Sequence, residues 1–225
     1  TMGKELYDWF YTTETDTLKA WKNGTYTKYG NILNYIGKRV GVEDFAATVQ
    51  WVTEQVFLDL AIKCKQLGAK KLIVTGGCAQ NIVAMTMIRP MFEDMHIPVA
   101  PTDAGSALGA AAWSWAHETG NATGRLNWKS PYLGHDLSVD LNPKSIANFL
   151  NKHKICGVAN GRAEFGPRAL GNRSLLADVR TDVKSTVNKI KRRQDFRPFA
   201  PAIMSEFAEE YFEGYMGEYM QYTTK

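Results

Sequence analysis

The sequence predicts an α/β protein built in two parts. Along the chain, a helix, a strand and a glycine turn follow one another twice, first ending at Gly76 and Gly77 and then at Gly161. The stretch between these units, residues 121–140, is rich in turn-forming residues and reads as a linker. Repeated helix–strand units of this kind are typical of α/β folds.

The composition excludes several classes of protein. With 44% hydrophobic and 22% charged residues over 225 positions, the chain has an ordinary globular composition, which argues against disorder. No apolar run approaches the roughly 20 residues that a membrane-spanning helix needs, so we expect no membrane segment. Three widely spaced cysteines and the absence of a secretion signal favour reduced thiols and a cytoplasmic location, with Cys78 expected to be small and buried.

Apolar residues at three- and four-residue spacings predict a helix over residues 42–67, which Gly68 ends. Residues 1–41 show little periodicity and are predicted to form loops with short helices. Residues 70–75 read as a buried strand that runs into Gly76 and Gly77, and a helix is expected over residues 79–92. Such a turn suits either an anion near the helix start or a tight connection without a ligand.

A second strand is predicted over residues 96–100, followed by a helix that is rich in small residues and ends at Gly120. The small side chains predict that this helix packs very close to neighbouring backbone. Asp103 stands at the expected helix start. Its carboxylate could cap the first-turn amides or bind a metal ion, and spacing alone leaves both interpretations open.

After the linker, the sequence predicts a helix over residues 143–151 and a strand over residues 155–159. The next stretch, residues 161–199, is the basic segment. It carries ten Lys and Arg against four Asp and Glu, a local charge of +6 in a chain of net charge +4. Gly166, Pro167 and Gly171 interrupt its arginines, which favours a shaped pocket for a phosphate-bearing small molecule. Nucleic acid is the second choice, because few aromatic residues are interleaved for stacking.

Five motifs then carry a family resemblance. GRAEFGPRALGNRSLLAD and VNKIKRRQDFRPFAP, preceded by VTGGCAQN, PTDAGSALGAA and SPYLGHDLS, resemble the NodU/tobramycin-type O-carbamoyltransferases. The resemblance covers residues 42–212. It implies that residues 1–128 are the C-terminal part of an actin-like, sugar-kinase-like ATPase-fold domain, and that residues 129–225 are the N-terminal part of a YrdC-like α/β domain.

The resemblance also implies a reaction and its site. Carbamoyl phosphate and ATP, with Mg²⁺, would form carbamoyl adenylate in the YrdC-like domain, and the first domain would transfer the carbamoyl group to an acceptor hydroxyl. The catalytic groups implied are Arg162, Arg168, Arg173, Lys191 and Arg197. Substrate and ATP contacts are implied for Asn172, Ser174 and Lys189, and contacts with the adenylate nucleotide for Gly76, Gly77 and Asn81.

Not every cation in the basic segment is assigned to the site. Arg180, Lys184, Arg192 and Arg193 are expected to form a solvated face, and Phe196 and Phe199 to be buried. Replacing Arg173 with alanine is expected to abolish adenylate formation while leaving the fold intact.

By resemblance, Asp103 becomes a ligand of a divalent metal, with iron expected, beside the transferred group. The histidine ligands of that metal would lie upstream of Thr1, and the rest of the YrdC-like domain beyond Lys225, so we expect a fragment that is inactive by itself. Two alternatives stay open: a factor that carbamoylates or threonylcarbamoylates tRNA or protein, and a non-catalytic nucleic-acid-binding module. Within the main hypothesis, a nucleic-acid partner is expected only if the acceptor is a modified base.

Overall fold

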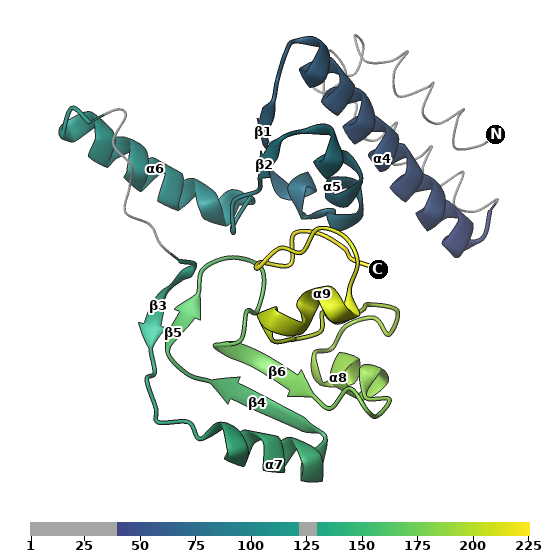
Figure 1. Cartoon of the computed structure of the whole chain (residues 1–225), viewed down its shortest axis with the longest axis vertical. Coiled ribbons are helices and arrows are strands. Elements are labelled where there is room, and N and C mark those ends of the chain that lie inside the picture. The colour runs from purple at the N-terminus through teal and green to yellow at the C-terminus, as the bar shows by residue number, and fades with distance from the viewer. Residues whose placement is uncertain (1–39, 122–129) are drawn as a thin grey trace. The chain divides into compact units, whose positions relative to one another are not determined.

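The computed structural model describes residues 40–121 and 130–225 (Figure 1). The prediction for residues 1–41 therefore lies almost entirely outside the described residues. The chain divides into two compact units. Of the described residues, the first unit comprises 40–72 and Val83–Met95, and the second comprises Ile73–Ile82, 96–121 and 130–225. The domain boundary between residues 128 and 129 stays a prediction.

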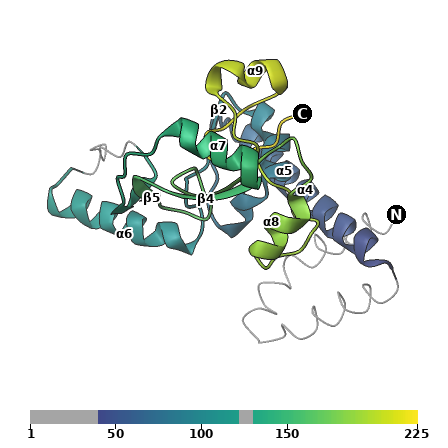
Figure 2. The same ribbon diagram turned by 90° about the horizontal axis from the view of Figure 1, so that it is seen from below.

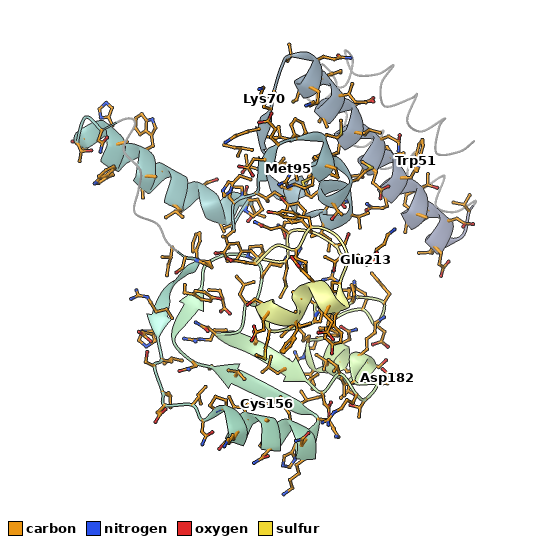
Figure 3. The ribbon with its side chains drawn as sticks, viewed as in Figure 1. Trp51, Lys70, Met95, Cys156, Asp182 and Glu213 are labelled. Carbon is orange, nitrogen blue, oxygen red and sulfur yellow. The ribbon has the colours of Figure 1, made fainter. Side chains whose placement is uncertain are left out.

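The first unit begins with helix α4, Val42–Gln66, as its apolar spacing predicts. Acidic residues in its first turn and lysines in its last turn match the helix dipole. Gly68 follows with a φ of 86°, a left-handed conformation that favours glycine. On α4, Val52 and Ala61 are buried, whereas Trp51 is exposed (Figure 3).

The single helix expected over residues 79–92 is wrong. The structure has a 3₁₀ helix η1 (Gly77–Gln80), helix α5 (Ile82–Ile88) and a 3₁₀ helix η2 (Arg89–Met91). The backbone at Asn81 has ψ of 87°, which separates η1 from α5, and Pro90 cannot donate the next helical hydrogen bond. Among the described residues of the first unit, α5 together with Phe92 and Met95 supplies most of the buried apolar side chains.

Strand β1, Lys71–Ile73, lies within the predicted strand and pairs with β2, Asp94–His96. The second strand is thus earlier in the chain than the predicted residues 96–100. Pro98 and Pro101 explain this difference, because proline has no N–H to donate to a sheet. Ile97 and Ala100 are nevertheless buried, so the apolar pattern reflects burial without a strand.

In the second unit, helix α6 spans Asp103–Glu118, and Gly120 follows with a φ of 64°. Its close approach to backbone is confirmed at Gly105, where a Cβ atom would lie 2.0 Å from the carbonyl oxygen of Ala100. Alanine at Gly109 would meet nothing within 4 Å. The start of α6 is therefore fitted against the chain segment that precedes it.

Two antiparallel pairs of strands form the centre of the second unit (Figure 1). Strand β3 (Tyr132–Asp136) pairs with β5 (Arg162–Glu164), and β4 (Ile155–Ala159) pairs with β6 (Arg173–Ala177). β4 matches the predicted strand. β3 lies in the predicted linker, and β5 and β6 lie in the basic segment, where no strand was expected.

Helix α7, Pro143–His153, is confirmed and lies beside β4 in both ribbon views (Figures 1 and 2). Its start is explained by Asn142, whose Oδ1 accepts the Lys144 N–H at 2.9 Å, and by Pro143 at the first helical position. Lys154 ends the helix in the left-handed conformation. Cys156 follows on β4 (Figure 3).

Helix α8, Lys184–Ile190, buries Val187 and Asn188. The Asn188 Nδ2 donates to the carbonyl oxygens of Asp195 at 3.1 Å and Arg197 at 3.2 Å. The Arg193 guanidinium donates to Asn188 Oδ1 and to the Pro198 carbonyl, and it lies 4.2 Å from the Phe199 ring centroid. Arg193 therefore stabilises the local structure, which corrects the prediction that it belongs to a solvated face.

The C-terminal part of the second unit is short helices and turns. It contains η3 (Ser205–Phe207) and α9 (Ala208–Tyr211), and Glu213 exchanges two backbone hydrogen bonds with Lys225 (Figure 3). The predicted burial of two aromatic residues is wrong, because Phe196 is 75% exposed and Phe199 is 41% exposed.

Asp178 is the centre of a charged cluster after β6. Its carboxylate accepts hydrogen bonds from Arg180 Nε at 2.8 Å and from Lys154 Nζ at 3.0 Å, and its side chain is only 5% exposed. Arg180 also contacts Asn151 Oδ1 on α7. Arg180 thus links β6 to α7, which corrects the expectation that it is only solvated.

We expect the Asp178 cluster to make stability depend on pH. Hydrogen bonds from Arg180, and then from Lys154, hold the pKa of Asp178 well below its ordinary value. The contribution of Asp178 to the free energy of unfolding is therefore complete above its unfolded-state pKa of about 3.9. It is lost as the pH falls through the lower pKa of the folded state. Asp178→Asn should lower the urea midpoint of unfolding at pH 7. It should also make the midpoints at pH 7 and pH 3 differ by less than they do in the wild type. Asp182→Asn removes an exposed carboxylate four residues further along the chain (Figure 3), and it should change neither the midpoint at pH 7 nor its pH dependence. Equal behaviour of the two variants would contradict the assignment.

Candidate functional site

The connection from β5 to β6, residues 165–172, is the arginine loop, and it carries Arg168. Three glycines around it, Gly161, Gly166 and Gly171, have positive φ values. At Gly166 a Cβ atom would also lie 2.8 Å from the Val99 carbonyl oxygen. The glycines that interrupt the arginines in the sequence therefore shape this loop, as the pattern predicted.

Glu164 holds the arginine loop from inside. One carboxylate oxygen, Oε1, accepts the backbone N–H groups of Leu170 at 2.8 Å, Asn172 at 2.8 Å and Arg173 at 3.1 Å. Burial acts to raise the pKa of this carboxyl, but the backbone hydrogen bonds outweigh it, so the pKa lies below its ordinary value. Glu164 is therefore a carboxylate at neutral pH, and it closes the end of the loop.

The Arg173 guanidinium donates hydrogen bonds to four backbone carbonyls. Nη1 donates to Asn160 at 2.9 Å and Asn172 at 2.7 Å, and Nη2 donates to His135 at 3.0 Å and Gly161 at 3.2 Å. A guanidinium has five N–H groups, and these four bonds use every one on the two terminal nitrogens. Nothing is left for the two-pronged phosphate contact that the sequence predicted at this residue.

Asn172 and Ser174, both predicted substrate contacts, also take part in the loop. Asn172 Nδ2 donates to the Arg162 carbonyl at 2.8 Å, and Ser174 Oγ accepts the Gly171 N–H at 2.9 Å. Tyr132 adds a hydrogen bond from its hydroxyl to the Leu170 carbonyl at 3.1 Å. These contacts make the loop a well-defined structure, and they leave the Ser174 hydroxyl proton available to a ligand.

Arg168 and Arg162 differ from Arg173, because each of their guanidinium groups makes only one hydrogen bond to the described residues. Arg168 Nη2 makes one long hydrogen bond, 3.4 Å, to the Gln80 carbonyl, and Arg162 Nη2 makes one of 3.5 Å to the Leu133 carbonyl. Arg168 is half-buried and Arg162 is exposed. Most of their donors therefore point to no protein acceptor within the described residues, as an anion site requires.

A small pocket lies beside Arg168 within the second unit. Besides Arg168 and Pro167, residues of three segments line it: Ala79, Gln80 and Ile82; Ile97, Pro98, Val99 and Pro101; and Tyr219, Met220 and Gln221. It has room for about one water molecule in this conformation. Tyr219 brings a phenol whose pKa is raised by burial and by the adjoining Glu218 carboxylate. The pocket thus joins an unspent guanidinium to neutral hydrogen-bonding groups.

Around α8, three more predicted site residues are exposed cations: Lys189, Lys191 and Arg197. Their side chains make no hydrogen bond or ion pair with the part of the chain that the structure describes. The same holds for Lys184 and Arg192, which agrees with the predicted solvated face. Among the described residues, no hydrogen bond or ion pair from these side chains reaches the arginine loop, and their joint role in one site stays a prediction.

Gly76, Gly77 and Asn81 lie together at η1. Gly76 has a φ of 96° and donates its N–H to the Pro101 carbonyl at 2.6 Å, while Asn81 donates its backbone N–H to the Cys78 carbonyl. The turn is therefore tied to the segment before α6. Cys78 is exposed, which corrects the expectation of a buried thiol.

Asp103 is not the cap of α6. Thr102 occupies the N-cap position, no side chain there accepts a capping hydrogen bond, and Asp103 is the first helical residue and exposed. Among residues 40–121 and 130–225, no group of three or more His, Cys, Asp or Glu side chains is placed to hold a metal ion. The described residues therefore do not fit a complete metal centre, and Asp103 would be a lone ligand.

Two family models match successive parts of this sequence. One, described as the N-terminus of carbamoyltransferases, matches residues 9–112, and the other, described as their C-terminus, matches residues 147–225. The chain belongs to the NodU-type carbamoyltransferase family. The order of the two carbamoyltransferase matches agrees with the family resemblance of the sequence motifs, while the actin-like and YrdC-like folds stay predictions.

Curated relatives support this family membership. The nodulation protein NolO of Bradyrhizobium diazoefficiens is 35% identical over 195 residues, covering 76% of this chain and 35% of NolO. Nodulation protein U of Sinorhizobium fredii is 33% identical over 187 residues, covering 76% of this chain and 33% of that protein. An uncharacterized protein of Methanocaldococcus jannaschii is 33% identical over 204 residues, covering 78% of this chain and 33% of that protein. The chain thus spans about a third of the length of these relatives.

Sequence reasoning missed Glu164, Tyr132 and Asn188. Glu164 offered a signal, because it is one of only four acids in the basic segment and stands directly before the glycine-rich stretch. Tyr132 and Asn188 offered none, since their partners are backbone groups distant in sequence or hidden in a turn. Within the described residues, no helix has the length and hydropathy required to cross a membrane.

Proposed function

We propose that this chain is part of an ATP-dependent O-carbamoyltransferase. In the proposed reaction, water takes the phosphoryl group of carbamoyl phosphate, and the carbamate oxygen bonds to the α-phosphorus of ATP as pyrophosphate leaves. The carbamoyl adenylate then gives its carbamoyl group to an acceptor hydroxyl. The unspent guanidinium of Arg168, held on a closed loop inside the carbamoyltransferase C-terminal match, is the observation that carries the proposal.

The arrangement of charge suits this chemistry. Two anionic substrates must approach each other, and negative charge must be offset at the phosphorus under attack. In the proposal Arg168 and Arg162 bind carbamoyl phosphate, because most of their guanidinium N–H groups have no acceptor among the described residues. Lys189, Lys191 and Arg197 bind the phosphates of ATP, with Mg²⁺ as their counterion. Asn172, Ser174 and Arg173 shape the loop between them.

The nucleotide contacts of Gly76, Gly77 and Asn81 are part of the same proposal. Gly76 lacks a side chain, and nothing lies within 4 Å of the position its Cβ would occupy, so a ligand can approach the backbone there. A divalent metal, if Asp103 is one of its ligands, would polarise the acceptor or the transferred group. Because the described residues do not complete such a centre, no step here depends on it.

Exchange of labelled pyrophosphate into ATP tests the proposal. The protein that carries these residues should catalyse this exchange only when carbamoyl phosphate is present, since the adenylate forms reversibly from both substrates. Calorimetry on the 225-residue chain should separately show carbamoyl phosphate binding. Exchange that proceeds equally without carbamoyl phosphate, or no exchange in a folded protein that binds ATP, would exclude adenylate formation.

A nucleic-acid-binding module is the second candidate. The observation in its favour is a group of exposed cations around α8 whose side chains have no hydrogen bond or ion pair with residues 40–121 and 130–225: Lys184, Lys189, Lys191, Arg192 and Arg197. Contacts with a phosphate backbone weaken steeply as salt rises, because bound counterions are released. Binding of an oligonucleotide that falls by orders of magnitude between 50 and 200 mM salt, with no binding of carbamoyl phosphate, would favour this function.

A further inference from the structure

We infer that Glu164 is a positioning residue, whose carboxylate fixes the arginine loop so that Arg168 presents its guanidinium to carbamoyl phosphate. The identity of the ligand in this role rests on the proposed function. The structural part of the role, the fixing of the loop, is independent of the proposed function, because the three hydrogen bonds to Glu164 form without any substrate.

The geometry makes Glu164 the closing point of the loop. Glu164 is the last residue of β5, and the N–H groups that donate to it lie six to nine residues further along, across the whole arginine loop. A single oxygen accepts the N–H groups of Leu170, Asn172 and Arg173. Hydrogen bonds to a charged acceptor are stronger than those between neutral groups, so the loop end depends on this carboxylate.

The remaining contacts leave Arg168 itself weakly held. Phe165 donates its N–H to the Pro131 carbonyl at 2.7 Å at the start of the loop, and the Glu164 bonds fix its end. Between these points, the Arg168 guanidinium has one hydrogen bond to the part of the chain that the structure describes, the 3.4 Å bond to the Gln80 carbonyl. The direction of Arg168 is therefore set by the backbone that Glu164 fixes. A bound anion would have to break only one long hydrogen bond to contact the guanidinium, so the free-energy cost of that change is small.

Other carboxylates of the second unit do not have this arrangement. Glu209, on α9, is exposed and has no hydrogen bond or ion pair in the described residues, and it supplies a matched control. Glu164→Gln keeps the size of the side chain and an oxygen acceptor but removes the charge. Glu164→Ala removes the acceptor altogether.

Amide hydrogen exchange in the full 225-residue chain tests the structural half of the inference. In Glu164→Ala, the amides of Leu170, Asn172 and Arg173 should exchange at least about tenfold faster than in the wild type, as expected for the loss of a charged acceptor. Glu164→Gln should lie between the two, and Glu209→Gln should match the wild type. Unchanged exchange at the three amides in a folded Glu164→Gln variant would overturn the inference, whatever the ligand does.

Affinity tests the positioning half. Titration with carbamoyl phosphate should show about a tenfold or greater loss in Glu164→Ala, partial rescue in Glu164→Gln, and unchanged affinity for ATP. General destabilisation would weaken both ligands alike, so an equal loss for ATP, or fast exchange with unchanged carbamoyl phosphate affinity, would overturn positioning. If the wild type binds no carbamoyl phosphate, the proposed function and this positioning role fail, while the exchange rates still decide whether Glu164 fixes the loop.

Discussion

Replacing Arg173 with alanine should destabilise the second unit by about 2–4 kcal/mol, because four hydrogen bonds to backbone carbonyls are lost together. The carbonyls belong to the end of β3, the turn before β5 and the end of the arginine loop. Without the guanidinium these groups lose their shared donor, and water must reach them. Urea unfolding followed by circular dichroism would measure the change in free energy.

Two further variants sharpen this result. Arg173→Lys keeps the charge but cannot hold four carbonyls in one plane, so it should recover only part of the stability. Lys189→Ala removes an exposed cation whose side chain has no hydrogen bond or ion pair within the described residues, and it should change the free energy of unfolding by less than about 0.5 kcal/mol. An Arg173→Ala protein as stable as the wild type would contradict the structural role and return Arg173 to the list of ligands.

This outcome also changes how a loss of activity at Arg173 is to be interpreted. The sequence motif alone predicts that Arg173→Ala loses adenylate formation with the fold intact. The carbonyl contacts predict that activity falls because the loop loses its shape. Stability and ligand affinity therefore have to be measured on the same variant.

Arg168→Ala should show the opposite pattern. Loss of a charged donor to carbamoyl phosphate should cost about 1.5–3 kcal/mol of binding, a decrease of roughly 10- to 100-fold in affinity. Stability should change by less than about 1 kcal/mol, because one long hydrogen bond to Gln80 is all that is lost within the protein. Calorimetric titration with carbamoyl phosphate and urea unfolding would measure the two quantities.

The control for Arg168 is another cation of the same segment. Arg192→Ala removes an exposed guanidinium that has no side-chain partner in the described residues, and it should leave carbamoyl phosphate affinity unchanged. If both variants lose affinity equally, the basic segment attracts anions through its general charge, and the assignment of Arg168 is wrong. Arg168→Lys separates charge from shape, since an ammonium lacks the two-pronged geometry.

The elements that the sequence predicted are those whose signal is local. Helices α4, α6 and α7 follow from spacing, capping and terminal glycines, and β4 from its apolar run. β3, β5 and β6 were missed, because their pairing joins residues far apart in the chain. β5 also consists of only Arg162–Glu164, too short to show alternation.

In the candidate site, the sequence identified the charged segment but could not show which charges the protein uses itself. Arg173, Arg180 and Arg193 resemble Arg168 in type and surroundings along the sequence. They differ only in the acceptors that folding brings to them: backbone carbonyls, the Asp178 carboxylate and the Asn188 amide oxygen. That difference is set by tertiary structure, and no spacing rule contains it.

The two close glycine contacts also limit how this protein can vary. Gly105 and Gly166 leave no room for a methyl group beside two consecutive peptide carbonyls, those of Ala100 and Val99. A missense change in either codon would force the main chain apart on one side of that short segment. Gly109, four residues along the same helix, has open space and accepts alanine, which favours helix formation. In a library of single-codon variants, codons 105 and 166 should be depleted together, while codon 109 tolerates change.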